Sequence, residues 1–179
     1  MTISTRGRYG LRAMLVLALR YDSGPVAAQQ IAGDQGFSVK YLEALLGSLK
    51  RAGLIIATRG KTGGYALARH PAQITLYDVL SPLEDSLDVV HCTEDNSCCA
   101  RTATCVTRDV WRQIKEVTER HLKGATLDDL RRRQVALLRK RPRAGVKPGR
   151  PSQSPPVPPR HSLRRTDPRA RRRSASTGS

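Results

Sequence analysis

The 179-residue sequence predicts a mainly α-helical domain with one small β-hairpin, followed by a disordered basic C-terminal tail. Apolar residues recur at helical spacing over most of residues 1–138, and one short β-prone stretch surrounds the turn signal KTGG. Residues 139–179 hold 13 Lys or Arg, one acidic residue, eight of the 11 prolines and no aromatic residue. Such a segment buries too little apolar surface to offset the entropy of ordering it. We therefore predict a folded domain, residues 1–138, and a tail, residues 139–179.

Three helices come first. The first is predicted over roughly residues 7–22, where SGP ends it, and apolar residues lie on one face at Leu11, Met14, Leu15, Ala18 and Leu19. A shorter helical piece in VAAQQIAGDQG closes at Gly36, because glycine adopts the left-handed conformation that stops a helix. The third helix has Ser38 as its N-cap and Gly53 as its stop. Its apolar face comprises Leu42, Leu45, Leu46 and Leu49.

Two short helices joined by a tight glycine turn form a helix-turn-helix, and the β-prone segments LIIATRG and YALAR then predict a hairpin. A hairpin in this place is the wing of a winged helix. A leucine stripe or a basic face alone is usually core or solvated surface, but this ordered series predicts binding to a double-stranded DNA operator. The second helix would enter the major groove and the wing would follow the backbone or minor groove. The candidate DNA-contacting residues are Ser38, Lys40, Tyr41, Glu43, Arg59 and Lys61.

Two helix-start signals and one long apolar stripe follow the wing. Thr75 with Asp78, and Thr126 with Asp129, have the spacing of capping boxes. Between them, residues 106–124 predict a long helix ending at a glycine, with Trp111 beside its apolar face. The apolar face comprises Val106, Val110, Ile114 and Val117. We expect a second subunit to cover this face in a two-fold homodimer; the alternative is packing against the first helix of the same chain.

All four cysteines lie in the cysteine loop, residues 92–105. Neither a signal peptide nor an apolar run long enough to cross a bilayer is evident, so we expect a cytoplasmic protein with no membrane partner, whose thiols stay reduced. The spacing is not C-x2-C, the commonest zinc knuckle. Adjacent side chains of an extended loop point in opposite directions, so one of Cys98 and Cys99 is a bystander. An iron–sulfur cluster, a zinc ion, a thiol switch and inert cysteines all remain open.

Four motifs, STRGRYGLRAM, KYLEALLGSLKRAGLI, TRGKTGGYALAR and CVTRDVWRQI, resemble the winged-helix regulators of the IscR/NsrR type. The resemblance covers about residues 1–135. It implies a dimeric bacterial repressor or activator of a family that senses iron–sulfur status, nitric oxide, iron or cysteine supply. For this chain we expect sensing of iron–sulfur, redox or nitric-oxide status. The implied fold is a winged helix-turn-helix whose cluster-bearing loop precedes a long dimerisation helix, residues 106–124. The resemblance also marks Tyr41, Glu43 and Arg59 as DNA-binding positions.

The resemblance places the three cluster ligands at Cys92, Cys99 and Cys105, and a second register uses Cys98 in place of Cys99. Some relatives have a fourth, histidine ligand three residues after the last cysteine, where this chain has Arg108, which cannot ligate. An acidic ligand near the N-terminus, used by some other members, is also missing from STRGRYG. Cys98, His91, Glu43, a water or a small thiol could complete the site, so the cluster can be of the 2Fe–2S or the 4Fe–4S type.

Three other functions compete with an iron–sulfur regulator. One is an iron-free regulator with a thiol or zinc switch. Another is an enzyme with a cysteine nucleophile, which the sequence disfavours because His91 is the only local base and no phosphate loop or carboxylate pair is evident. The last is a nucleic-acid-compacting protein that acts through its tail. We therefore expect a DNA-binding regulator that is not an enzyme.

Overall fold

The computed structural model describes residues 3–60, 63–93, 97, 99–102 and 104–140, and it confirms a mainly α-helical fold with one antiparallel hairpin. Lys61, Cys98 and residues 141–179 of the predicted tail lie outside the described residues. The helices and strands are α1 (Thr5–Leu19), α2 (Ala28–Gln35), α3 (Val39–Arg51), β1 (Ile55–Thr58), β2 (Gly64–Leu67), α4 (Leu76–Leu80), α5 (Val106–Gly124) and α6 (Leu127–Lys140). Short 3-10 turns lie at η1 (Tyr21–Ser23), η2 (Pro71–Gln73) and η3 (His91–Thr93).

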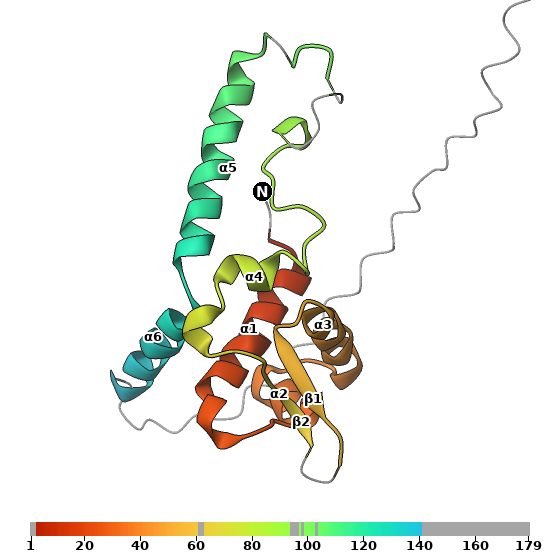
Figure 1. Ribbon diagram of the computed structural model, residues 1–179, viewed down its shortest axis with the longest axis vertical. Coiled ribbons are helices and arrows are strands. Elements are labelled where there is room, and N and C mark those ends of the chain that lie inside the picture. Colours follow the sequence, from red (N-terminus) through yellow and green to blue (C-terminus); the bar gives the residue numbers. More distant parts are fainter. Residues whose placement is uncertain (1–2, 61–62, 94–96, 98, 103, 141–179) are drawn as a thin grey trace, which may run out of the picture.

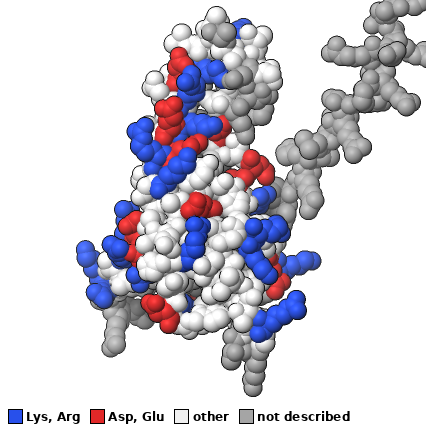
Figure 2. Space-filling model, in the orientation of Figure 1, with Lys and Arg blue, Asp and Glu red and all other residues white. Residues whose placement is uncertain are grey.

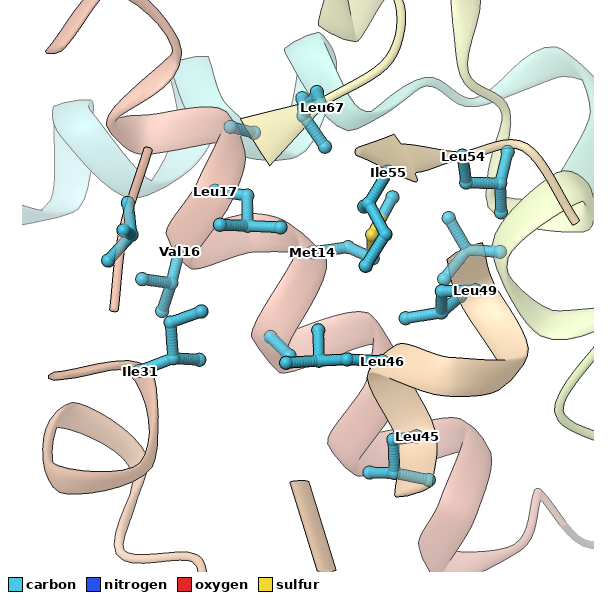
Figure 3. Close-up of a cluster of buried hydrophobic side chains, with 14 of the residues drawn as sticks. Met14, Val16, Leu17, Ile31, Leu45, Leu46, Leu49, Leu54, Ile55 and Leu67 are labelled. Atoms are coloured by element: carbon cyan, nitrogen blue, oxygen red, sulfur yellow. The ribbon is translucent and has the colours of Figure 1, made fainter. Parts of the chain in front are cut away.

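The head of the molecule, which comprises α1 to α4 and the hairpin, is built around α1. This helix contacts α2, α3, α4, α6 and β2, while α5 extends away from the head (Figure 1). Met14 and Leu17 of α1 meet Leu46 and Leu49 of α3 in a cluster that Ile55 of β1 completes (Figure 3). Each of these five side chains is at most 2% exposed. Apolar burial on this scale contributes about 1.5–3 kcal/mol per side chain.

The helix-turn-helix forms as the sequence predicts. Gly36 ends α2 with φ of 70°, in the left-handed region, and its N–H bonds to the Ala32 carbonyl. Ser38 then caps α3 by accepting a hydrogen bond from the Tyr41 N–H at 3.3 Å. The four predicted leucines of α3 are all buried. The predicted bounds of the first helix were wrong at both ends, because Ser4 caps an earlier start and the last residues form η1.

The wing is a two-stranded hairpin with a third backbone segment bridged to its outer strand. β1 and β2 pair in antiparallel register, with Ile55 opposite Leu67, and Val26 forms an isolated bridge to Tyr65 on the other side of β2. The two backbone hydrogen bonds of this bridge are 2.8 and 2.9 Å long. The start of β2 thus lies between two backbones, and Gly64 is the residue at the closest approach.

Both predicted capping boxes are present, and they are joined to each other. Thr75 and Asp78 exchange side-chain-to-backbone hydrogen bonds at the start of α4, and Thr126 and Asp129 do so at the start of α6. Thr75 and Thr126 also form an antiparallel bridge, flanked by two backbone hydrogen bonds of 2.9 Å. Because α6 follows directly after α5, this bridge ties the C-terminal end of α5 to the head.

Asp128, in the first turn of α6, is buried, whereas its partner Arg131 is partly exposed and its partner Arg132 is exposed. Its carboxylate accepts hydrogen bonds from Arg131 Nε at 2.7 Å and from Arg132 Nε at 2.6 Å. The bond from Arg131, followed by that from Arg132, holds the pKa of Asp128 below its ordinary value although burial opposes the shift. This stabilising contribution is therefore present above the ordinary carboxyl pKa and is lost as pH falls through the lowered one.

Replacement of Gly64 by alanine should lower the free energy of unfolding by about 1–3 kcal/mol, the usual cost of overpacking. The new Cβ would lie 2.5 Å from the Val26 carbonyl oxygen, which is backbone and is fixed by the bridge to Tyr65. Gly33→Ala in α2 is the matched control. Nothing lies within 4 Å of its Cβ position, and alanine should raise helix stability by up to about 1 kcal/mol. Urea unfolding measures both, and a destabilised Gly33→Ala protein would contradict this reading.

Candidate nucleic-acid interface and cysteine loop

The face of α3 opposite its buried leucines is open to solvent. Ser38, Lys40 and Glu43 are exposed, and Ala44 lies beside them. Small residues on this face allow a close approach to a flat or grooved surface, while Lys40 and Glu43 supply one charge of each sign. This arrangement suits a helix whose first turns meet base edges and phosphates in the major groove.

Tyr41 differs from the other candidates on α3, because it is half-buried in an aromatic cluster. Its ring meets Tyr9 of α1 edge to face at 6.0 Å, and Tyr9 stacks on Phe37 at 4.2 Å. The Arg12 guanidinium lies 5.2 Å from the centre of the Phe37 ring and donates from Nε to Gln35 at 2.8 Å. Burial raises the pKa of Tyr41 although Arg6 opposes the shift. Its ring therefore helps to set the angle between α1 and α3.

The wing has an exposed outer surface. Arg59 is exposed directly after β1, next to Thr58, and Lys61 lies outside the described residues. Ile56 of β1 is 53% exposed. On the face shown in Figure 2, several basic side chains gather over the lower part of the head and over α6, whereas both signs of charge alternate along α5.

The segment after α4 is hydrogen-bonded to the first turn of α1, at the end of this helix that also carries the aromatic cluster. Glu84 Oε1 accepts hydrogen bonds from the Ser4 N–H and hydroxyl, both at 3.0 Å. The close contact is possible because Gly7 has no Cβ; one built there would collide with the Glu84 carboxylate. Arg6 and Asp85 form an exposed ion pair at 3.7 Å beside this contact. The segment that leads to the cysteine loop is thus attached to α1.

The two faces of α5 have different surroundings. At about 100° of rotation per residue, Lys115 lies about 180° around the helix from Val106. The side carrying Trp111 and Lys115 is partly covered, and α5 packs on α4 and η3. The predicted apolar stripe lies on the other side and is 39–78% exposed, so it does not pack on the first helix of its own chain. The stripe consists of Val106, Val110, Ile114 and Val117.

The three described cysteines are free thiols. Cys92 in η3 and Cys105 at the start of α5 are partly exposed, and Cys99 is exposed. Cys105 is the N-cap of α5, and its Sγ lies 3.1 Å from the Thr107 hydroxyl. The Thr107 hydroxyl, with smaller contributions from the backbone and Arg101, holds the pKa of Cys105 below its ordinary value. A lowered pKa favours the thiolate, the form that binds metals and reacts with oxidants.

Residues 3–133 match the sequence profile of the Rrf2 family, described as an iron-dependent transcriptional regulator. The chain belongs to the Rrf2 family. Protein rrf2 of Nitratidesulfovibrio vulgaris is 43% identical over 132 residues, which cover 74% of this chain and 88% of that protein. Membership confirms the predicted fold and a DNA-binding transcriptional regulator that is not an enzyme. In the part of the chain that the structure describes, no helix is both long and apolar enough to cross a bilayer.

Two solved Rrf2-type structures match over most of the described chain. Each is 35% identical and superposes with a TM-score of 0.63. One is IscR from T. potens, which covers 80% of this chain and 94% of its own. The other is CymR, the global cysteine regulator of B. subtilis, which covers 73% of this chain and 96% of its own.

The donor set of the loop fits an iron–sulfur cluster chemically, since soft thiolates are the ligands that such clusters prefer. Among the described residues, however, no three His, Cys, Asp or Glu side chains lie close enough together to hold a metal ion. The predicted ligands Cys92, Cys99 and Cys105 therefore do not converge here, and Cys98 is outside the described residues. Binding of a metal group would be coupled to closure of the loop.

Some residues that shape the site were not predicted from the Rrf2-like sequence. Glu84 holds the loop's root on α1, and Arg108 donates from Nε to the Cys92 carbonyl at 2.9 Å. Helical periodicity cannot reveal such bonds, because Glu84 and Ser4 are 80 residues apart in the chain. The sequence singled out only Arg108, because it stands where some relatives have a histidine ligand.

Loss of the Glu84 carboxylate should loosen the first turn of α1. Glu84→Ala leaves the partly buried Ser4 N–H without its partner, which costs about 1–3 kcal/mol, and should speed amide hydrogen exchange in residues 4–8. Asp85→Ala is the matched control at the next residue. Asp85 is 97% exposed in its ion pair with Arg6, so the change should cost less than about 0.5 kcal/mol. Equal effects of the two variants would argue against a specific role for Glu84.

Proposed function

We propose that this Rrf2-family protein regulates transcription by sensing iron–sulfur, redox or nitric-oxide status through a cluster bound by its cysteine loop. It acts as a homodimer on a two-fold DNA operator. The observation that carries the proposal is that the cysteine loop, whose three described cysteines are free thiols, is attached at both of its ends. Glu84 joins its root to α1, and Cys105 is the N-cap of α5.

The ligands we propose are Cys92, Cys99 and Cys105, with Cys98 as the alternative to Cys99. An iron–sulfur cluster supplies a group whose oxidation, loss or reaction with nitric oxide follows the state of the cell. The lowered pKa of Cys105 increases the share of the ligating thiolate. Because Arg108 cannot ligate, the fourth ligand must come from elsewhere.

A change of loop conformation has a short physical route to the DNA-reading helix. The root of the loop contacts the first turn of α1 through Glu84, and Tyr9 in the next turn contacts Phe37 and Tyr41 at the start of α3. We infer that loop closure changes the angle of α3 through these contacts. Packed side chains transmit such shifts because they have few alternative arrangements.

The second candidate is an iron-free thiol or zinc switch. Two observations favour it: Cys105 has a lowered pKa, and no set of three ligands is assembled among the described residues. The similarity to CymR points the same way, because another solved CymR, from Staphylococcus aureus, is described as an oxidized form and is 31% identical to this chain. Iron and sulfide analysis of protein purified without oxygen separates the two candidates.

Removal of one ligand thiol should abolish the cluster. Cys92→Ala, Cys99→Ala and Cys105→Ala should each lose the brown visible chromophore, because a site with three thiolates has no spare ligand. Cys98→Ala is the matched control and should retain most of it. Anaerobic reconstitution with visible spectroscopy measures all four variants. Bleaching by Cys98→Ala but not by Cys99→Ala would establish the other register.

Glu43 should set sequence preference more than affinity. A carboxylate in the major groove accepts from cytosine N4 and disfavours other bases and phosphates, so Glu43→Ala should relax discrimination between operators while total binding changes little. Lys40→Ala, a neighbouring exposed change, should weaken binding to all sequences and reduce the log–log salt slope by about 0.9. Titrations against matched and scrambled operators test this. A uniform loss for Glu43→Ala would contradict the assignment.

A charge in the apolar stripe should break the dimer. Val110 and Val117 are 49% and 60% exposed on a face that the rest of the described chain leaves open. Because each side chain is already about half buried, covering its exposed part by a second α5 contributes about 1 kcal/mol. Val110→Glu should therefore shift the protein to monomers in sedimentation equilibrium. Ile56→Glu, the same kind of change on the outer face of β1, should leave the dimer intact; a monomeric wild type would remove the proposal.

A further inference from the structure

Arg108 connects the two ends of the cysteine loop. Its Nε donates a hydrogen bond to the Cys92 carbonyl at 2.9 Å, and its own backbone N–H donates to the Cys105 carbonyl at 3.1 Å. The first and last cysteines are therefore both bonded to one residue in the first turn of α5. A hydrogen bond from a guanidinium is charge-assisted and stronger than one between neutral groups.

Lys115 makes a second connection on the same side of α5. Its Nζ lies 2.8 and 3.0 Å from the two carboxylate oxygens of Asp88, just before η3. The Thr93 hydroxyl lies 3.2 Å from Asp88 Oδ2 and 2.7 Å from the Val90 carbonyl. Only 8% of the Asp88 side chain and 29% of the Lys115 side chain are exposed. Solvent ions therefore screen this pair less than a surface pair.

The two connections act together because of their spacing on the helix. Arg108 and Lys115 are seven residues apart, which is about two turns, so they project from the same face of α5. Residues 88–93 are thus held along α5 at two points. This face is separate from the apolar stripe, so a second subunit on the stripe leaves both connections in place.

We propose that Arg108, Lys115 and Asp88 are positioning residues that hold Cys92 beside the start of α5 before any metal group or disulfide forms. The expected effect on the stability of a bound cluster rests on the proposed function, whereas the positioning of Cys92 by these residues does not. Fixing one end of a loop in advance removes part of the entropy cost of bringing its ligands together. In this chain, a hydrogen bond from Arg108 thus holds the loop at the position where some relatives use a histidine ligand.

The first measurement is amide hydrogen exchange on the full-length protein without metal. Arg108→Met and Lys115→Met should each speed exchange in residues 88–93 by about tenfold, the effect of one lost charge-assisted hydrogen bond. Exchange in α1 and α3 should stay unchanged, which shows that the head remains folded. Arg112→Met is the matched control, because Arg112 pairs with Asp109 of the same helix. Unchanged exchange in both test variants would overturn the proposal.

The second measurement is the lifetime of the chromophore after anaerobic reconstitution with iron and sulfide and addition of a chelator. Arg108→Met and Lys115→Met should bleach several-fold faster than wild type, whereas Arg112→Met should not, and Lys115→Arg should restore the lifetime. Faster exchange with unchanged bleaching would overturn the positioning role. If the wild type takes up no iron, the proposed cluster is contradicted but the positioning of Cys92 is not. Faster alkylation of Cys92 in Arg108→Met than in the wild type would then support the positioning. Unchanged alkylation would overturn it.

Discussion

The burial of one face of α1 is the constraint on which the rest of the structure depends. Met14 and Leu17 belong to a single apolar cluster, to which α2, α3, β1 and β2 each contribute buried side chains. The N-terminal turns of the same helix carry Tyr9 and Gly7, which contact α3 and the root of the cysteine loop respectively. One helix therefore serves as the core of the head and as the element between the loop and the proposed DNA-reading surface on α3.

The arrangement of α5 follows from how its two ends are held. Its C-terminal end is tied to the head by the bridge between Thr75 and Thr126, and its N-terminal end carries Cys105 far from the head (Figure 1). Because α5 is one continuous helix of 19 residues, a displacement of its N-terminal end also changes the position of its C-terminal end. The charged contacts of Arg108 and Lys115 lie on the covered face, which leaves the apolar stripe available for a partner.

The cysteine loop and α3, the proposed DNA-reading helix, are stabilised by different kinds of interaction. Four buried leucines hold α3 in the core, so its angle is set by packing. Hydrogen bonds and ion pairs at the surface of α5 hold the segment around Cys92. A segment held by a few polar contacts opens more readily than a packed core does. A loop held in this way can respond to its thiol chemistry while the head remains folded.

The sequence by itself determined the helices, the capping residues and the wing, because these depend on periodicity and on local chemistry. Ser38, Gly36 and the pair Thr75 and Asp78 act as predicted since their partners lie within five residues. The order of these elements also sufficed to predict a DNA-binding regulator, which family membership confirms.

Only the tertiary structure decided where Tyr41 points, what Glu84 holds and what Arg108 does in place of a histidine. Each of these depends on residues distant in the chain, which a one-dimensional pattern cannot bring together. The ligand set and the dimer remain predictions, because the three proposed ligand cysteines do not converge among the described residues and the dimer requires a second subunit. Local chemistry is encoded by neighbouring residues, whereas the distances between segments are set by the packing of the whole head.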